Sequence, residues 1–235
     1  GEFTKVFTLA MEEKYEEMMK YVDIANTVKE FTFGSDIKIT EGKFLYKGKE
    51  INSSIAKRII AASQQNDGSV QKFINFFLKL YKNPSYTSIQ HCYDFMVHND
   101  LEITENGDIK GFKYVSVAGS IPVDSYTRKV PQWKGWIVRM DRNLVEDNPE
   151  ATCSHGLHIG SWDYVSSQKH IIEVTFSPEH VVSVPVDANG MKMRACQYKI
   201  VGVVRGLEDI AVIKSLASIV TVDEQGNTLS VEVIQ

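Results

Sequence analysis

One stretch marks the fold of this chain: Thr152-Cys153-Ser154-His155-Gly156-Leu157-His158-Ile159-Gly160-Ser161-Trp162-Asp163-Tyr164. Leu157 and Ile159 alternate with smaller or polar neighbours, which indicates a short strand. Ser161 follows at a position where a side-chain oxygen can cap the free amides of a helix. We therefore predict a polar loop, a strand and a helix in direct succession.

The same stretch offers zinc ligands, because Cys153, His155 and His158 lie within six residues and Cys196 is available as a fourth ligand. Structural zinc sites usually draw their ligands from two closely spaced pairs, whereas Cys196 is a lone, distant cysteine. The favoured interpretation is a buried thiol beside hydrogen-bonded histidines, and zinc is the alternative. A cysteine nucleophile is a further alternative, although a strand directs His155 and His158 to opposite faces.

The composition indicates the size and general class of the protein, but it gives little information about its function. The chain has 235 residues, of which 43% are hydrophobic, so it is long enough for one large domain or two small ones. Its net charge of -4 gives no overall attraction to nucleic acid. Three scattered cysteines are typical of a reducing compartment, and no apolar run approaches the ~20 residues of a membrane span.

The N-terminal part of the sequence predicts helices and a small hairpin. Residues 1–35 are expected to form a helix over 11–22 and a linker, with 1–3 resembling a cloning scar. A hairpin is expected from Ile37 to Tyr46, and apolar spacing over 53–62, 69–81 and 84–96 predicts three helices. The segment 36–100 is therefore expected to be a hairpin with a three-helix module.

From Leu101 the sequence changes to short alternating apolar runs with frequent turns, which are typical of strands. A terminal hairpin is expected from residues 219–222 and 229–233. The segment 101–235 is predicted to be a mixed or antiparallel sheet domain with one or two helices. The predicted fold class of the whole chain is therefore α+β.

Basic and aromatic residues alternate near the middle of this segment, where Trp133 and Trp136 accompany Arg128 and Lys134. Single-strand nucleic-acid binders combine aromatic stacking with basic side chains in this way. The more ordinary interpretation is a basic edge strand with a tryptophan anchored in the core, and the acidic net charge favours it.

Five motifs follow one another within about residues 36–205. The motifs are Asn83-Pro84-Ser85-Tyr86, Leu101-Glu102-Ile103-Thr104-Glu105-Asn106-Gly107, Phe112-Lys113-Tyr114-Val115, the Thr152 to His158 stretch, and Val181-Val182-Ser183-Val184-Pro185. Their order resembles that of the rIIB family of bacteriophage proteins. The resemblance implies a phage accessory protein of the host cytoplasm. It further implies a binding role in lysis timing, in protection from prophage exclusion or in counter-defence, through a host or phage protein partner. It implies no reaction, so we expect binding rather than catalysis.

Tyr114 lies on an early predicted strand, and His158 and Ser161 lead into a predicted helix that carries Tyr164. This order resembles ADP-ribosyltransferase-like domains, in which a strand with a His or Arg, a Gly-Leu/Ile-Tyr/His strand leading into a helix, and later strands hold NAD. The first strand lacks the His or Arg of that family, and no Glu can be assigned to orient the ribose. The resemblance therefore implies a degenerate pocket for an NAD-type nucleotide, with these four residues as its candidate ligand contacts.

Overall fold

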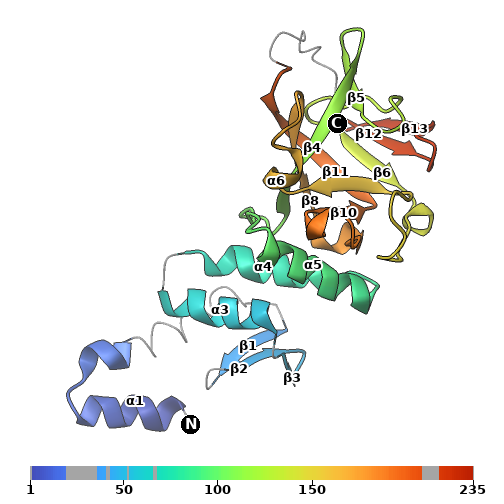
Figure 1. Cartoon of the computed structure of the whole chain (residues 1–235). Coiled ribbons are helices and arrows are strands. Elements are labelled where there is room, and N and C mark those ends of the chain that lie inside the picture. The colour runs from blue at the N-terminus through green and yellow to red at the C-terminus, as the bar shows by residue number, and fades with distance from the viewer. Residues whose placement is uncertain are drawn as a thin grey trace. The chain divides into compact units, whose positions relative to one another are not determined.

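The computed structural model describes residues 2–19, 36–40, 43–51, 53–65, 68–207 and 217–234. The chain divides into two compact units, Gly1–Phe77 and Leu78–Gln235. Helices accompany a small antiparallel sheet in the first unit and a large mixed sheet in the second (Figure 1). The predicted α+β class is confirmed.

The first helix, α1 (Glu2–Met11), lies earlier than the helix predicted over 11–22. Glu13 has a positive φ of 57°, a left-handed conformation that interrupts the helix after Met11, and residues 15–19 are helical again. Residues 20–22 lie outside the described residues. The predicted scar overlaps this element, because Glu2 and Phe3 belong to α1.

The rest of the N-terminal unit follows the predicted hairpin and helices. Strands β1 (Ile37–Thr40), β2 (Lys43–Tyr46) and β3 (Lys49–Glu50) pair antiparallel, and Lys47 and Gly48 both have the positive φ that a tight hairpin turn requires. Helices α3 (Ser54–Gln65) and α4 (Val70–Leu80) follow. Phe44 is buried and packs edge to face on Phe77 of α4, with ring centroids 4.7 Å apart.

Helix α5 (Tyr86–His98) is hydrogen-bonded to the sheet of the C-terminal unit. The Ser85 hydroxyl caps it by accepting from the Ser88 amide, and the Ser88 hydroxyl donates to the Val182 carbonyl at 2.6 Å. The buried Asn83 amide donates to the carbonyls of Pro178 and Val181. The compact unit Leu78–Gln235 therefore contains α5 together with the sheet to which it is hydrogen-bonded.

The described strands of the C-terminal unit form one ten-stranded sheet of order β13-β12-β6-β11-β8-β4-β7-β10-β9, with β5 paired to β4. Only β12 and β6 are parallel; the other pairs are antiparallel. The strands are β4 (Ile109–Ala118), β5 (Ile121–Asp124), β6 (Ile137–Met140), β7 (Leu157–Gly160), β8 (Ile171–Phe176), β9 (Val181–Ser183), β10 (Lys192–Ala195), β11 (Gln197–Arg205), β12 (Ser218–Val222) and β13 (Thr228–Val233). The short helix α6 (Trp162–Val165) follows β7 and lies beside β4 (Figure 1). Single-turn helices cover Arg142–Leu144, Pro178–His180 and Ala188–Gly190.

The register places one apolar face along most of this sheet. Residues paired directly across strands point to the same face. The aligned positions include Val220, Val138, Tyr198, Ile200, Val174, Ile172, Lys113, Ile159 and Met193. We call this the inner face; all of these residues except Lys113 are hydrophobic or aromatic, and each of those is 2% exposed or less.

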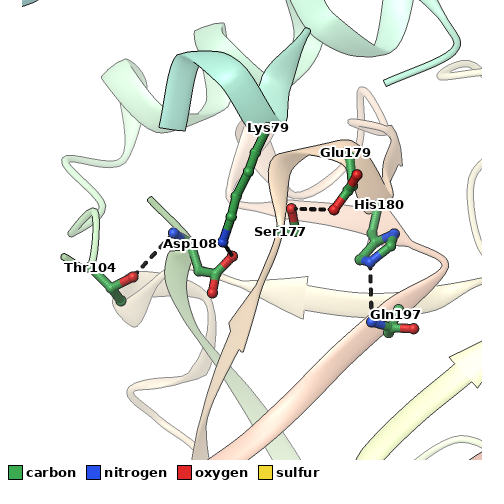
Figure 2. A network of polar contacts seen from close by, with 7 residues as sticks. All are labelled: Lys79, Thr104, Asp108, Ser177, Glu179, His180 and Gln197. Atoms are coloured by element: carbon green, nitrogen blue, oxygen red, sulfur yellow. Dashed lines mark hydrogen bonds and ion pairs between the residues drawn. The ribbon is translucent and has the colours of Figure 1, made fainter. Parts of the chain in front are cut away.

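A polar network ties the segment before β4 and the segment before β9 to neighbouring elements (Figure 2). Lys79 at the end of α4 forms an ion pair with Asp108 at 2.6 Å, and the Asp108 amide donates to the Thr104 hydroxyl. His180 contacts the Gln197 amide at 3.1 Å, and burial lowers the pKa of His180. These contacts fix the ends of strands rather than any cavity.

Candidate functional site

Strands β4 and β7 separate soon after they meet. They share a single paired position, Phe112 with Gly160, and the ladder does not continue to Tyr114 and His158. The backbone carbonyl of His158 instead accepts a hydrogen bond from the Lys113 side chain. A sheet that opens between two strands leaves room for side chains and ligands, and a cavity lies at this opening.

This cavity has a volume of about 260 Å³. Its lining includes Val222 of β12 and Met140 of β6 as well as His158 of β7, although these strands are far apart in the sheet order. The sheet must therefore curve strongly for them to line one space. Three loop segments contribute further parts of the wall: residues 125–127, residues 153–156, and Asp223, Glu224 and Gly226.

Three of the four predicted ligand contacts line this cavity: Tyr114, His158 and Tyr164. The Tyr114 and Tyr164 rings have centroids 6.0 Å apart, and Gly160 lies beneath Tyr164, close enough that a Cβ would meet its ring. Burial, and then the neighbouring Tyr114 hydroxyl, raises the pKa of Tyr164 well above its usual range. The pair therefore forms a neutral aromatic wall against which a flat ring can stack.

Ser161 does not line the cavity. It precedes α6 as predicted, but its side chain makes no capping hydrogen bond, so the expected cap is wrong. The residue is 3% exposed, and its hydroxyl oxygen has no partner among the described residues. Its backbone amide donates to the carbonyl of Met191, the residue before β10.

His158 is held in its neutral form. Burial, followed by the positive charges of Lys113, Lys192 and Arg194, lowers the pKa of His158 to about 3. The Nε2 atom of the ring has no hydrogen-bond partner among the described residues. A neutral imidazole with a free nitrogen can donate to or accept from a bound ligand.

Lys113 lines the same cavity and was not among the predicted contacts. Its ammonium lies over the Tyr198 ring, 4.8 Å from the centroid, and the Tyr198 hydroxyl donates to Gln132 at 2.7 Å. Burial lowers the pKa of Lys113 to about 8. One signal in the sequence could have identified it. Lys113 is separated by an even number of positions from Ile109 and Val115, which are both buried, so all three lie on the same face of β4.

The described residues provide no cluster of ligands for the zinc alternative. Across residues 2–19, 36–40, 43–51, 53–65, 68–207 and 217–234, no three His, Cys, Asp or Glu side chains gather as a metal site would require. Cys153, His155, His158 and Cys196 are therefore not assembled around one point. Cys153 is exposed and Cys196 is buried, and burial raises the pKa of the Cys196 thiol.

The candidate nucleic-acid residues lie on one turn and a nearby loop. Trp133, Lys134 and Trp136 occupy a tight turn before β6, closed by a Trp136 amide to Trp133 carbonyl bond of 3.0 Å. The tryptophans are half-buried, whereas Lys134 and Arg128 are exposed. In the described part of the chain, no helix has the length and apolar character needed to cross a membrane.

Known proteins were compared with this chain. A family model described as bacteriophage T4 protein rIIB matches residues 2–225, which extends the predicted match over 36–205 at both ends. The chain is 32% identical over 203 residues to Protein rIIB of Enterobacteria phage T4, covering 85% of this chain and 64% of that relative. No solved structure matches the chain. This chain belongs to the rIIB family of bacteriophage proteins.

Proposed function

We propose that this protein acts by binding, and that its cavity takes a nucleotide-type ligand. The observation that carries the proposal is the convergence of Tyr114, Tyr164 and His158 on one cavity with a buried lysine. Ligand sites combine apolar and aromatic walls with a few convergent polar groups, and this cavity has both. The tyrosine rings supply stacking, and His158 and Lys113 supply polar contacts.

Thermal unfolding with added ligand tests this function. A ligand present at 100 times its dissociation constant stabilises the folded protein by ~2.7 kcal/mol, which raises the melting temperature measurably. The probes are adenosine, guanosine, their 5′-monophosphates, ADP-ribose and NAD at millimolar concentration. We expect at least one probe to raise the melting temperature of the wild-type protein.

Two variants locate the effect. Tyr114→Ala should abolish the ligand-induced shift, because it removes one ring of the aromatic wall. Tyr86→Ala is the matched control, since Tyr86 on α5 is 77% exposed and lies outside the cavity lining. No shift with any probe, or an equal shift in Tyr114→Ala, would contradict a ligand site at this cavity.

Binding of a host or phage protein is the second candidate function. Family membership suggests an accessory role in the host cytoplasm, affecting lysis timing, prophage exclusion or host defence. The supporting observation is β13, the last strand in the sheet order, on which Leu229, Val231 and Val233 are 62%, 54% and 54% exposed. These alternate positions share one strand face, and exposed apolar edges are typical of partner surfaces.

A crosslinking pull-down from infected host cells tests this second candidate. The wild-type chain should recover a stoichiometric protein, and a Leu229→Glu, Val231→Glu double variant should lose it. Tyr126→Ser is a control, because Tyr126 is 83% exposed and lies in the turn after β5 rather than on β13. Repeated failure to recover any stoichiometric protein would count against this role.

A further inference from the structure

Lys113 is a cation placed on an apolar face. It shares the inner face of the sheet with Ile172, its paired neighbour on β8, and with Ile159 of β7, which are 1% and 0% exposed. Taking an ammonium group out of water is costly unless an opposite charge or several acceptors replace the water. We therefore ask which acceptors the protein provides for this ammonium, because any donor hydrogen that remains can bind a ligand.

The protein provides the Lys113 ammonium with only some of the acceptors that a buried cation requires. The Lys113 ammonium donates to the His158 carbonyl and lies over the Tyr198 ring. Within the described part of the chain, no carboxylate lies within the 4.0 Å of an ion pair. An ammonium has three donor hydrogens, so two of them have no acceptor among the described residues.

The nearest acidic influence, Asp124, is already engaged elsewhere. Its carboxylate accepts from the Thr127 amide at 2.7 Å, from the Thr127 hydroxyl and from the Val130 amide at 2.9 Å. These bonds build the turn after β5, so the Asp124 charge is shared among local donors. The charge of Lys113 is thus left without a dedicated counter-ion inside a cavity that it lines.

We infer that Lys113 binds the anionic group of the ligand, and that this ligand is a nucleoside monophosphate. The inference rests on the nucleotide-type function proposed above and adds the residue that recognises charge and the size of the molecule. Drug-sized ligands occupy pockets of about 300–1,000 Å³. A cavity of about 260 Å³ suits one base, one ribose and one phosphate rather than a whole dinucleotide.

Neighbouring residues divide the recognition between the two sides of β4. Tyr114 and Lys113 are adjacent, so their side chains leave opposite faces of the strand. The opening between β4 and β7 connects these faces, because both residues line one cavity. A mononucleotide can then stack its base on Tyr114 and Tyr164 and direct its phosphate to the Lys113 ammonium. At neutral pH that ammonium remains mostly protonated, since the pKa of Lys113 is about 8.

Calorimetric titration of the full chain at pH 7 with a nucleoside and its 5′-monophosphate tests the inference. A charge-assisted hydrogen bond contributes enough that the monophosphate should bind about tenfold more tightly than the nucleoside. In Lys113→Met this ratio should fall to about one. Lys199→Met is the matched control, because Lys199 is an exposed lysine on β11, and it should keep the wild-type ratio.

The possible results distinguish phosphate recognition by Lys113 from the nucleotide-type binding on which it rests. Equal affinity of wild-type protein for nucleoside and monophosphate would overturn the inference while leaving nucleotide-type binding in place. A tenfold ratio that persists in Lys113→Met would assign the phosphate to another residue and also overturn it. Binding of neither probe would overturn the proposed function together with the inference. If Lys113→Met fails to fold, the comparison of nucleoside with monophosphate in the wild-type protein still tests the inference.

Discussion

At the scale of single residues, Gly160 sets the position of the aromatic wall. A Cβ at this position would lie 2.4 Å from Cδ1 of Tyr164, and no real Cβ approaches a ring carbon that closely. Gly160→Ala should therefore displace Tyr164 and lower the free energy of unfolding by about 1–3 kcal/mol. Urea denaturation measures this change.

Gly202→Ala provides the matched comparison, because a Cβ at Gly202 meets no atom within 4 Å. Its effect should stay within about 0.5 kcal/mol, as for most surface substitutions. If both alanine variants unfold at the same urea concentration, Tyr164 is not held against Gly160.

His158 should make stability depend on pH in the acidic range. Its pKa is about 3 in the folded chain and about 6.5 in an unfolded one, so the unfolded chain binds more protons between these values. The His158 contribution is complete above pH 6.5 and is lost as pH falls, by up to about 1.4 kcal/mol per pH unit. Denaturation of wild type and His158→Gln at pH 7 and pH 5 should show a smaller loss in the variant. Equal losses would mean that His158 is not buried in its neutral form.

Sequence reasoning at this scale named Tyr114, His158 and Tyr164, which line the cavity, but it did not name Lys113, which also lines it. The order of motifs along the chain indicated the first three, because His158 and Tyr164 lie in a strand-to-helix pattern and Tyr114 lies on the earlier strand. A lysine within an alternating strand is normally solvated, so residue type argued against Lys113. Only its spacing from Ile109 and Val115 indicated that Lys113 lies on the inner face. Its charge was the stronger signal, and it predicted an exposed side chain.

At the scale of elements, α5 depends on a buried amide. Asn83 donates to two carbonyls near β9, and its side-chain oxygen accepts from Arg142 at 2.9 Å. Asn83→Ala leaves these buried partners unsatisfied, so it should lower the free energy of unfolding by about 2–4 kcal/mol. Asn143→Ala is the control, since Asn143 is exposed and no hydrogen bond of its side chain is part of this network. Chemical denaturation of both variants makes the comparison, and a loss below ~1 kcal/mol in Asn83→Ala would show that α5 is held by apolar packing instead.

The elements themselves were predictable to different degrees. Helices α3, α4 and α5 and the terminal hairpin β12–β13 form near their predicted positions, because their apolar periodicity and turns are local signals. The N-terminal helix was misplaced, since the break at Glu13 depends on a single left-handed residue. The strand order was not predictable, because pairs such as β4–β8 and β12–β6 join segments far apart in the chain.

At the scale of the whole molecule, the cavity belongs to one of the two units. Every residue that lines it falls within the second unit, Leu78–Gln235. Binding stabilises the element that holds the ligand against opening, and hydrogen exchange measures such local stability. A bound nucleoside monophosphate should therefore slow amide exchange in β4, β7, β11 and α6, and leave α3 unchanged.

Mass-spectrometric hydrogen exchange with and without AMP makes this measurement in the intact chain. At 100 times the dissociation constant, protection in the sheet should increase by up to ~2.7 kcal/mol, which corresponds to about a hundredfold slower exchange where opening is global to the unit. Tyr114→Ala is the negative control, because it should lose the added protection in all four elements together. Added protection that also reaches α3 would mean that the two units unfold as one. Protection confined to the C-terminal unit would mean that ligand binding stabilises this unit alone.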